Sequence, residues 1–120
     1  MEVSQVQSLS QSIVATGFPY SRATNPHNNS KEFIQIMPRV QGIRRGGSAA
    51  LDMAYVACGR LDGYWEFHIK PWDVAGGGLL VKEAGGYLTT ASNRPWTLKS
   101  TSVVVGNQSI HQKLVDRIKV

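Results

Sequence analysis

The chain has 120 residues, of which 42% are hydrophobic and 18% are charged, which indicates one globular domain over residues 1–120 rather than a disordered segment. Its single cysteine, Cys58, excludes an intrachain disulfide and a multi-cysteine metal site. No apolar run approaches the roughly 20 residues of a membrane helix and no secretory signal pattern opens the chain, so we expect a protein of the cytoplasm or an organelle stroma, without membrane contact.

The first 45 residues predict two strands and one helix. Residues 1–10 are polar and are expected to be frayed. The β-branched run at 12–16 predicts a buried strand. A helix is expected to begin with Ser30 as its N-cap and to end or kink at Pro38, because a proline inside a helix removes a hydrogen bond and clashes with the preceding turn. Residues 40–45 predict a second short strand.

A second helix is predicted between Ser48, as its N-cap, and Gly59, which closes it. Four residues at helical spacing define its expected apolar face. They are Leu51, Ala54, Tyr55 and Cys58. On this face Cys58 is expected to be a buried and unreactive thiol.

The remainder of the chain continues the alternation of strands and helices. The aromatic content of 61–67 predicts a strand, and Pro71 stands at the expected first residue of the next helix. Two further strands are expected at 87–90 and 102–105, and an amphipathic helix at 110–118. The alternation predicts an α/β fold, a three-layer sandwich around a mixed sheet of about five strands.

Asp73 is the first candidate for a functional residue. It lies in the first turn of a predicted helix, where acids are common because they complement the helix dipole by about 0.3–1 kcal/mol. Three consecutive glycines, Gly76, Gly77 and Gly78, follow it, and each costs a helix about 1 kcal/mol relative to alanine. Close approach of a helix, a strand or a ligand would explain them.

Two further groups of candidates lie nearby in the sequence. Glu66 ends an aromatic strand, either as a solvated acid or as an acceptor for a sugar or polyol hydroxyl. Gly46 and Gly47 open the helix before it, either as a plain tight turn or as a helix start whose N–H groups meet an anion or a hydroxyl. Arg44 is a candidate phosphate ligand, although strand-edge arginines are usually only solvated.

Four segments together resemble the inositol monophosphatase family, over the C-terminal half of the family's enzymes. They are Gly47-Ser48-Ala49-Ala50-Leu51-Asp52, Gly63-Tyr64-Trp65-Glu66, Trp72-Asp73-Val74-Ala75-Gly76-Gly77 and Glu83-Ala84-Gly85-Gly86. The resemblance implies a layered α/β subdomain of a Mg²⁺-dependent phosphomonoesterase, usually a dimer. The expected substrate is inositol monophosphate or a similar polyol phosphate.

The resemblance also implies roles for individual residues. Asp73 matches an aspartate that ligates magnesium and lies near the substrate. Glu66 matches a carboxylate that contacts substrate hydroxyls, and Arg44 matches an arginine sometimes assigned to substrate binding. The helix start formed by Gly47, Ser48 and Ala49 matches residues that touch the substrate ring.

The family's N-terminal half brings a metal-binding glutamate, an Asp-Pro-x-Asp-Gly-Thr segment and a threonine that orients water, none of which occurs in this sequence. Asp73 alone cannot hold a catalytic magnesium ion, because this ion requires near-octahedral oxygen coordination. We therefore expect no catalytic residue here and no activity without an N-terminal half, supplied in cis or in trans.

Two alternatives differ in class from this enzyme fragment. The first is a non-catalytic binding or dimerisation module that retains the fold. The second, suggested by the net charge of +5, is a nucleic-acid-binding domain. It is disfavoured because the 13 lysines and arginines are scattered, and only Arg44 and Arg45 are adjacent.

Overall fold

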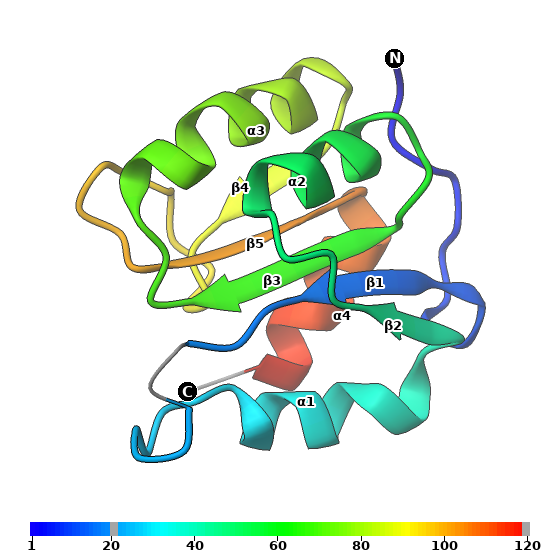
Figure 1. Cartoon of the computed structure of the whole chain (residues 1–120). Coiled ribbons are helices and arrows are strands. Elements are labelled where there is room, and N and C mark those ends of the chain that lie inside the picture. Colours follow the sequence, from blue (N-terminus) through cyan, green and yellow to red (C-terminus); the bar gives the residue numbers. More distant parts are fainter. Residues whose placement is uncertain (20–21, 119–120) are drawn as a thin grey trace.

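A mixed five-stranded sheet lies at the centre of the computed structural model, which describes residues 1–19 and 22–118 (Figure 1). The strands are β1 (Ile13–Thr16), β2 (Gly42–Arg44), β3 (Gly63–Phe67), β4 (Tyr87–Thr89) and β5 (Ser102–Gly106), in the spatial order β2-β1-β3-β5-β4. β1 runs parallel to both β2 and β3, whereas β5 is antiparallel to β3 and β4. The predicted five-strand mixed sheet is confirmed.

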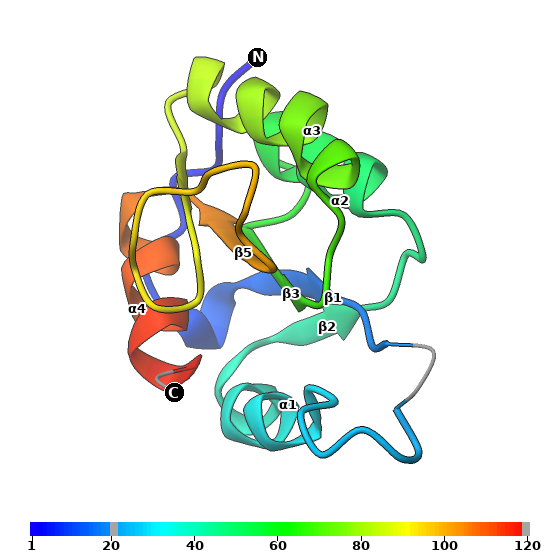
Figure 2. The same cartoon turned by 90° about the vertical axis from the view of Figure 1, so that its left-hand side faces the viewer.

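Helices cover both faces of the sheet, which gives the three predicted layers (Figures 1 and 2). α2 (Ala49–Ala57) and α3 (Pro71–Glu83) cover one face, and α1 (Ser30–Ile36) and α4 (Gln108–Ile118) cover the other. Two single-turn 3₁₀ helices, η1 (Leu9–Gln11) and η2 (Met37–Arg39), complete the helical elements of the described residues. Among these residues no helix has the length and apolarity needed to cross a membrane.

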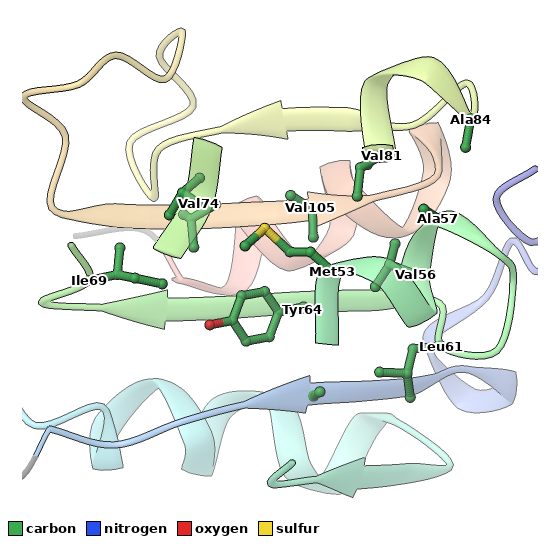
Figure 3. Packing of buried hydrophobic residues seen from close by; sticks show 12 residues of the cluster. Met53, Val56, Ala57, Leu61, Tyr64, Ile69, Val74, Val81, Ala84 and Val105 are labelled. Atoms are coloured by element: carbon green, nitrogen blue, oxygen red, sulfur yellow. The ribbon is translucent and has the colours of Figure 1, made fainter. Parts of the chain in front are cut away.

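Two glycines of α3 are explained by the packing of the α2–α3 layer. A Cβ atom added at Gly77 would lie 2.9 Å from Met53 of α2, and one added at Gly78 would lie 2.8 Å from Leu88 of β4. The helix thus approaches both neighbours more closely than alanine allows. Figure 3 shows Met53 and Tyr64 in the core that this approach closes. Gly76 faces open space, and the packing does not explain it.

The predicted apolar face of α2 is wrong. Met53, Val56 and Ala57 face the core, whereas Leu51 is 46% exposed and Cys58, at the C-cap, is also exposed. Cys58 is therefore not the buried thiol that the sequence predicts. The physical reason is that alanines fit either side of a helix, so an alanine-rich apolar pattern does not determine which side packs on the sheet.

The start of α1 also differs from the prediction, because Asn29 rather than Ser30 is its N-cap residue and has a left-handed backbone (φ 74°). The helix ends at Ile36, and Pro38 lies in the η2 turn that follows. This agrees with the expected end or kink near the proline. Asn29 makes no side-chain cap, because its amide is used elsewhere.

The buried amide of Asn29 joins three parts of the chain. Its Nδ2 donates to Thr16 Oγ1 and to the Gly17 carbonyl, both at 2.9 Å, and its Oδ1 accepts from Trp65 Nε1 at 2.7 Å. Thr16 Oγ1 in turn donates to the Trp65 carbonyl at 2.7 Å. These bonds hold the end of β1 and the middle of β3 against the start of α1.

Residues 1–10, which are expected to be frayed, have no regular structure before Leu9 but make hydrogen bonds at several positions. The Val3 N–H donates to the Ala84 carbonyl at 3.1 Å, at the end of α3. Asn107 Nδ2 donates to the carbonyl oxygens of Ser4 and Val6, at 3.0 and 2.8 Å. These bonds join the segment to the end of α3 and to the turn between β5 and α4.

Replacement of Asn29 by glycine tests the buried amide. Asn29→Gly tolerates the positive φ but leaves the Trp65 N–H without its acceptor, so the free energy of unfolding should fall by about 2–3 kcal/mol. Urea unfolding measures the change. Gln35→Ala, an exposed substitution on α1, should change it by less than about 0.5 kcal/mol. Equal effects of the two variants would contradict the assigned role of Asn29.

Candidate active site

The candidate residues gather at the carboxyl ends of three parallel strands. Gly17 follows β1, and the segment from Arg44 to Ser48 joins β2 to α2. Glu66 is the penultimate residue of β3, and Asp73 lies in the first turn of the helix that follows this strand. In open α/β sheets, ligands bind outside the carboxyl ends of parallel strands. The topology therefore brings these separate segments to one edge.

The start of α2 has the geometry of an oxygen-binding turn. Ser48 Oγ accepts a hydrogen bond from the Leu51 N–H at 3.2 Å, which confirms Ser48 as the N-cap. Gly47 has a positive φ of 79° and open space where a Cβ atom would stand. The first N–H groups of a helix have no intrahelical partner, so the turn from Gly47 through Ala49 presents backbone donors to solvent or to a ligand.

A buried tyrosine positions the Glu66 carboxylate. Tyr64 is fully buried, and its hydroxyl donates to Glu66 Oε1. Burial raises the pKa of Glu66, the Tyr64 hydrogen bond lowers it, and the nearby charge of Asp73 raises it. On another side, a Cβ atom added at Gly17 would lie 2.7 Å from Glu66 Oε1. The carboxylate is thus confined between the hydroxyl and the Gly17 backbone.

Asp52 is a third carboxylate here, and sequence reasoning missed it. It is only 4% exposed, and its Oδ1 packs so closely on Gly46 that no Cβ atom fits there. Burial, followed by the charge of Glu66, raises its pKa to about 6. One signal in the sequence could have indicated this burial, because Asp52 is next to Met53 on the side of α2 that packs on the sheet. The predicted apolar face of α2 lay on a different side, so the signal was not used.

Asp73 is exposed in the first turn of α3 and acts electrostatically on both Glu66 and Tyr64. Over residues 1–19 and 22–118, no three His, Cys, Asp or Glu side chains lie close enough together to hold a metal ion. The donor set of the described residues therefore does not fit a complete magnesium site, which needs about six oxygen ligands. Asp73 is the exposed carboxylate of the three, whereas Asp52 is buried.

The Arg44 side chain lies along its own strand. Arg44 is the last residue of the edge strand β2, is exposed, and lies 3.4 Å through Nη1 from the Ile43 carbonyl. Its guanidinium folds back toward Gly42, where an added Cβ atom would lie 3.2 Å from Nη1. The neighbouring Arg45 lies over the Phe18 ring, 4.8 Å from its centroid. Glu66 thus interacts electrostatically with Asp52 and Asp73, whereas the Arg44 side chain lies against residues of its own strand.

Comparison with known proteins agrees with this geometry. A profile of the inositol monophosphatase family matches residues 1–119. The chain belongs to the inositol monophosphatase family. The inositol-1-monophosphatase of Synechocystis sp. is 46% identical over 114 residues, which are 95% of this chain and 40% of that protein. The Nus factor SuhB of Pseudomonas aeruginosa is 38% identical over 121 residues, covering 99% of this chain and 45% of the relative.

Solved structures of the family show the same fold. The inositol monophosphatase of Anabaena (Nostoc) sp. PCC 7120 superposes with a TM-score of 0.93 at 46% identity, over 98% of this chain and 47% of the other. The staphylococcal IMPase-II with bound inositol monophosphate superposes with a TM-score of 0.82 at 31% identity. The chain thus spans less than half of each family member described here.

The pKa of Asp52 predicts a pH-dependent stability. Its pKa is about 6 in the folded chain against an ordinary 3.8, so the folded state binds this proton more tightly than the unfolded state. The stability that it contributes is complete below pH 3.8 and is lost as pH rises through 6. The Asp52→Asn variant does not undergo this loss. The difference in free energy of unfolding between the variant and the native chain should therefore increase, in favour of the variant, by about 1–3 kcal/mol from pH 4 to pH 7.

Urea unfolding across this pH range measures the difference. Glu66→Gln provides a second arm, because it removes the charge that helps to raise the pKa of Asp52. In that background the gain from Asp52→Asn should become smaller. A gain that does not change with pH, or that is unaffected by Glu66→Gln, would contradict the proximity of the two carboxylates.

Proposed function

We propose that this chain supplies the substrate-facing half of a Mg²⁺-dependent phosphomonoesterase that hydrolyses inositol monophosphate or a similar polyol phosphate. The observation that carries the proposal is the placement of Glu66 beside Asp73 and the start of α2, at the carboxyl ends of β1, β2 and β3. Membership in the inositol monophosphatase family supports it. The expected location is the cytoplasm or an organelle stroma.

Each residue of this half has a proposed task. Glu66, held by Tyr64, accepts a hydrogen bond from a substrate hydroxyl. Gly47, Ser48 and Ala49 offer backbone N–H groups to the substrate at the start of α2. Asp73 contributes one oxygen ligand to a magnesium ion whose other protein ligands lie outside the described residues. Arg44 contacts the phosphate only if its side chain turns from β2 toward this edge.

The outer face of α2 and α3 is the proposed contact for the remaining half. Leu51 is 46% exposed, Trp72 is 75% exposed and Leu79 is 58% exposed. These apolar side chains lie on α2, which Ser48 caps, and on α3, whose first turn carries Asp73. Large exposed apolar groups on one face are typical of an interaction surface. A segment docked there reaches Asp73 and is in place to supply the missing acidic ligands.

The same observations favour a second candidate, a non-catalytic module that dimerises or binds a partner through this apolar face. Leu51, Trp72 and Leu79 serve that role without any metal. The two candidates differ in one outcome, because only the enzyme half acquires phosphatase activity when the missing ligands are provided. The nucleic-acid-binding alternative requires a salt-dependent affinity set by several phosphate contacts.

Complementation tests the proposal. The chain is assayed for phosphate release from myo-inositol 1-phosphate with Mg²⁺, alone and mixed with the part of the Synechocystis relative that the chain does not match. We expect no turnover alone and turnover in the mixture. In the mixture Asp73→Asn should lower kcat at least about 100-fold, and Glu66→Gln should raise KM about tenfold.

Lys99→Gln, an exposed substitution in the loop before β5, is the matched control and should leave both constants unchanged. A complex that forms without turnover would favour the non-catalytic module. Turnover by the isolated chain that Asp73→Asn abolishes would overturn the half-site account, because the described residues would then suffice for catalysis.

A further inference from the structure

A pocket that is open to solvent lies on the sheet face opposite α2 and α3. Its volume is about 560 Å³. η1, η2 and α4 form its walls, and Figure 2 shows the blue N-terminal turn beside the red α4 and above α1. The candidate active site lies at the carboxyl ends of the parallel strands, on the α2–α3 side, so the two sites are separate.

The side chains around this cavity carry an excess of positive charge. Arg39 comes from η2, and Lys113 and Arg117 stand one turn apart on α4. Asp116 is the one acid in the lining, and its Oδ1 accepts a hydrogen bond from Gln112 Nε2 at 3.0 Å. In the described part of the chain, none of the three cations forms an ion pair with a carboxylate.

Two of these cations are fixed in place by main-chain acceptors. Lys113 Nζ donates to the Gln7 carbonyl at 2.6 Å, and Arg39 Nη1 donates to the Gln35 carbonyl at 2.7 Å. Each bond uses only one of the several N–H donors of the ammonium or guanidinium group. The carbonyl acceptor is neutral, so the positive charge of each group is not cancelled. Three like charges around one concave surface repel one another, so an anion bound between them is stabilised.

The neutral wall of the cavity adds hydroxyl donors and is already ordered. Ser8 and Ser10 line it, with their hydroxyl oxygens 3.4 Å apart. Leu9 between them is buried in the core on this face. Asn107 holds the segment through its 2.8 Å bond to the Val6 carbonyl. The surface is therefore preformed, and little conformational entropy is lost when a ligand binds.

We propose that this cavity binds the phosphoryl group of a small phosphorylated molecule. A phosphate dianion has several acceptor oxygens, which the planar guanidinium groups of Arg39 and Arg117 match geometrically, with Lys113 as a further charge. The Ser8 and Ser10 hydroxyls supply neutral hydrogen bonds to the same oxygens. This site is independent of the proposed phosphatase function, and either assignment can fail without the other.

Titration with inorganic phosphate tests the proposal on the ¹⁵N-labelled chain, with sodium chloride added to hold the ionic strength constant. Amide signals of residues 8–10, 39 and 113–117 should shift and saturate. Arg117→Gln, at an exposed position, should raise the Kd about tenfold. Lys82→Gln, which removes one exposed positive charge from α3, should change the Kd by less than about twofold.

Three results would overturn the proposal. Equal weakening by Arg117→Gln and Lys82→Gln would show a general effect of net charge. Saturable shifts confined to residues 46–50 would place the phosphate at the start of α2 instead. Shifts that never saturate would show no site. Repetition with glycerol 2-phosphate distinguishes the source of the phosphoryl group, because a lower Kd than that of inorganic phosphate identifies an ester as the better ligand.

Discussion

The hydrogen bond from the buried Tyr64 hydroxyl to Glu66 is the interaction on which the candidate active site depends. Without a donor, a carboxylate in this partly buried position would be expensive to keep charged, since burial itself raises its pKa. Tyr64 is held by the core of the α2–α3 layer (Figure 3). The orientation of a group at the surface is thus set by packing inside the molecule.

Two glycines allow neighbouring loops to pack closely against the carboxylates of the candidate active site. Gly17 lets the loop after β1 pass against Glu66, and Gly46 lets the loop after β2 pass against Asp52. The Asn29 amide fixes the first of these loops by binding both Thr16 and the Gly17 carbonyl. Three carboxylates therefore stand at one edge, where the charge of Glu66 raises the pKa of Asp52 and the charge of Asp73 raises that of Glu66.

The sequence predicts the architecture well because turn residues and β-branched runs are local signals. The strand at 12–16, the N-cap at Ser48 and the proline at the start of α3 all agree with the structure. The rotation of α2 was not predictable in the same way, because it depends on the close approach of Gly77 to Met53. The burial of Asp52 and the exposure of Cys58 follow from that rotation.

The candidate site was predictable only in part. Resemblance to the family selected Glu66 and Asp73, which the fold brings within electrostatic reach of each other. The hydrogen bond from Tyr64 joins residues two apart on one strand, and the contact of Gly17 joins segments 49 positions apart. The first needs the strand and the burial of Tyr64 to be known, and the second is not a local pattern at all. The direct test of the account is whether the polyol phosphate contacts this edge through Glu66, measured by titrating myo-inositol 1-phosphate into the ¹⁵N-labelled chain. The account predicts shifts at 46–50 and 66–73 that Glu66→Gln strongly reduces, whereas shifts elsewhere, or shifts that Glu66→Gln leaves unchanged, would contradict it.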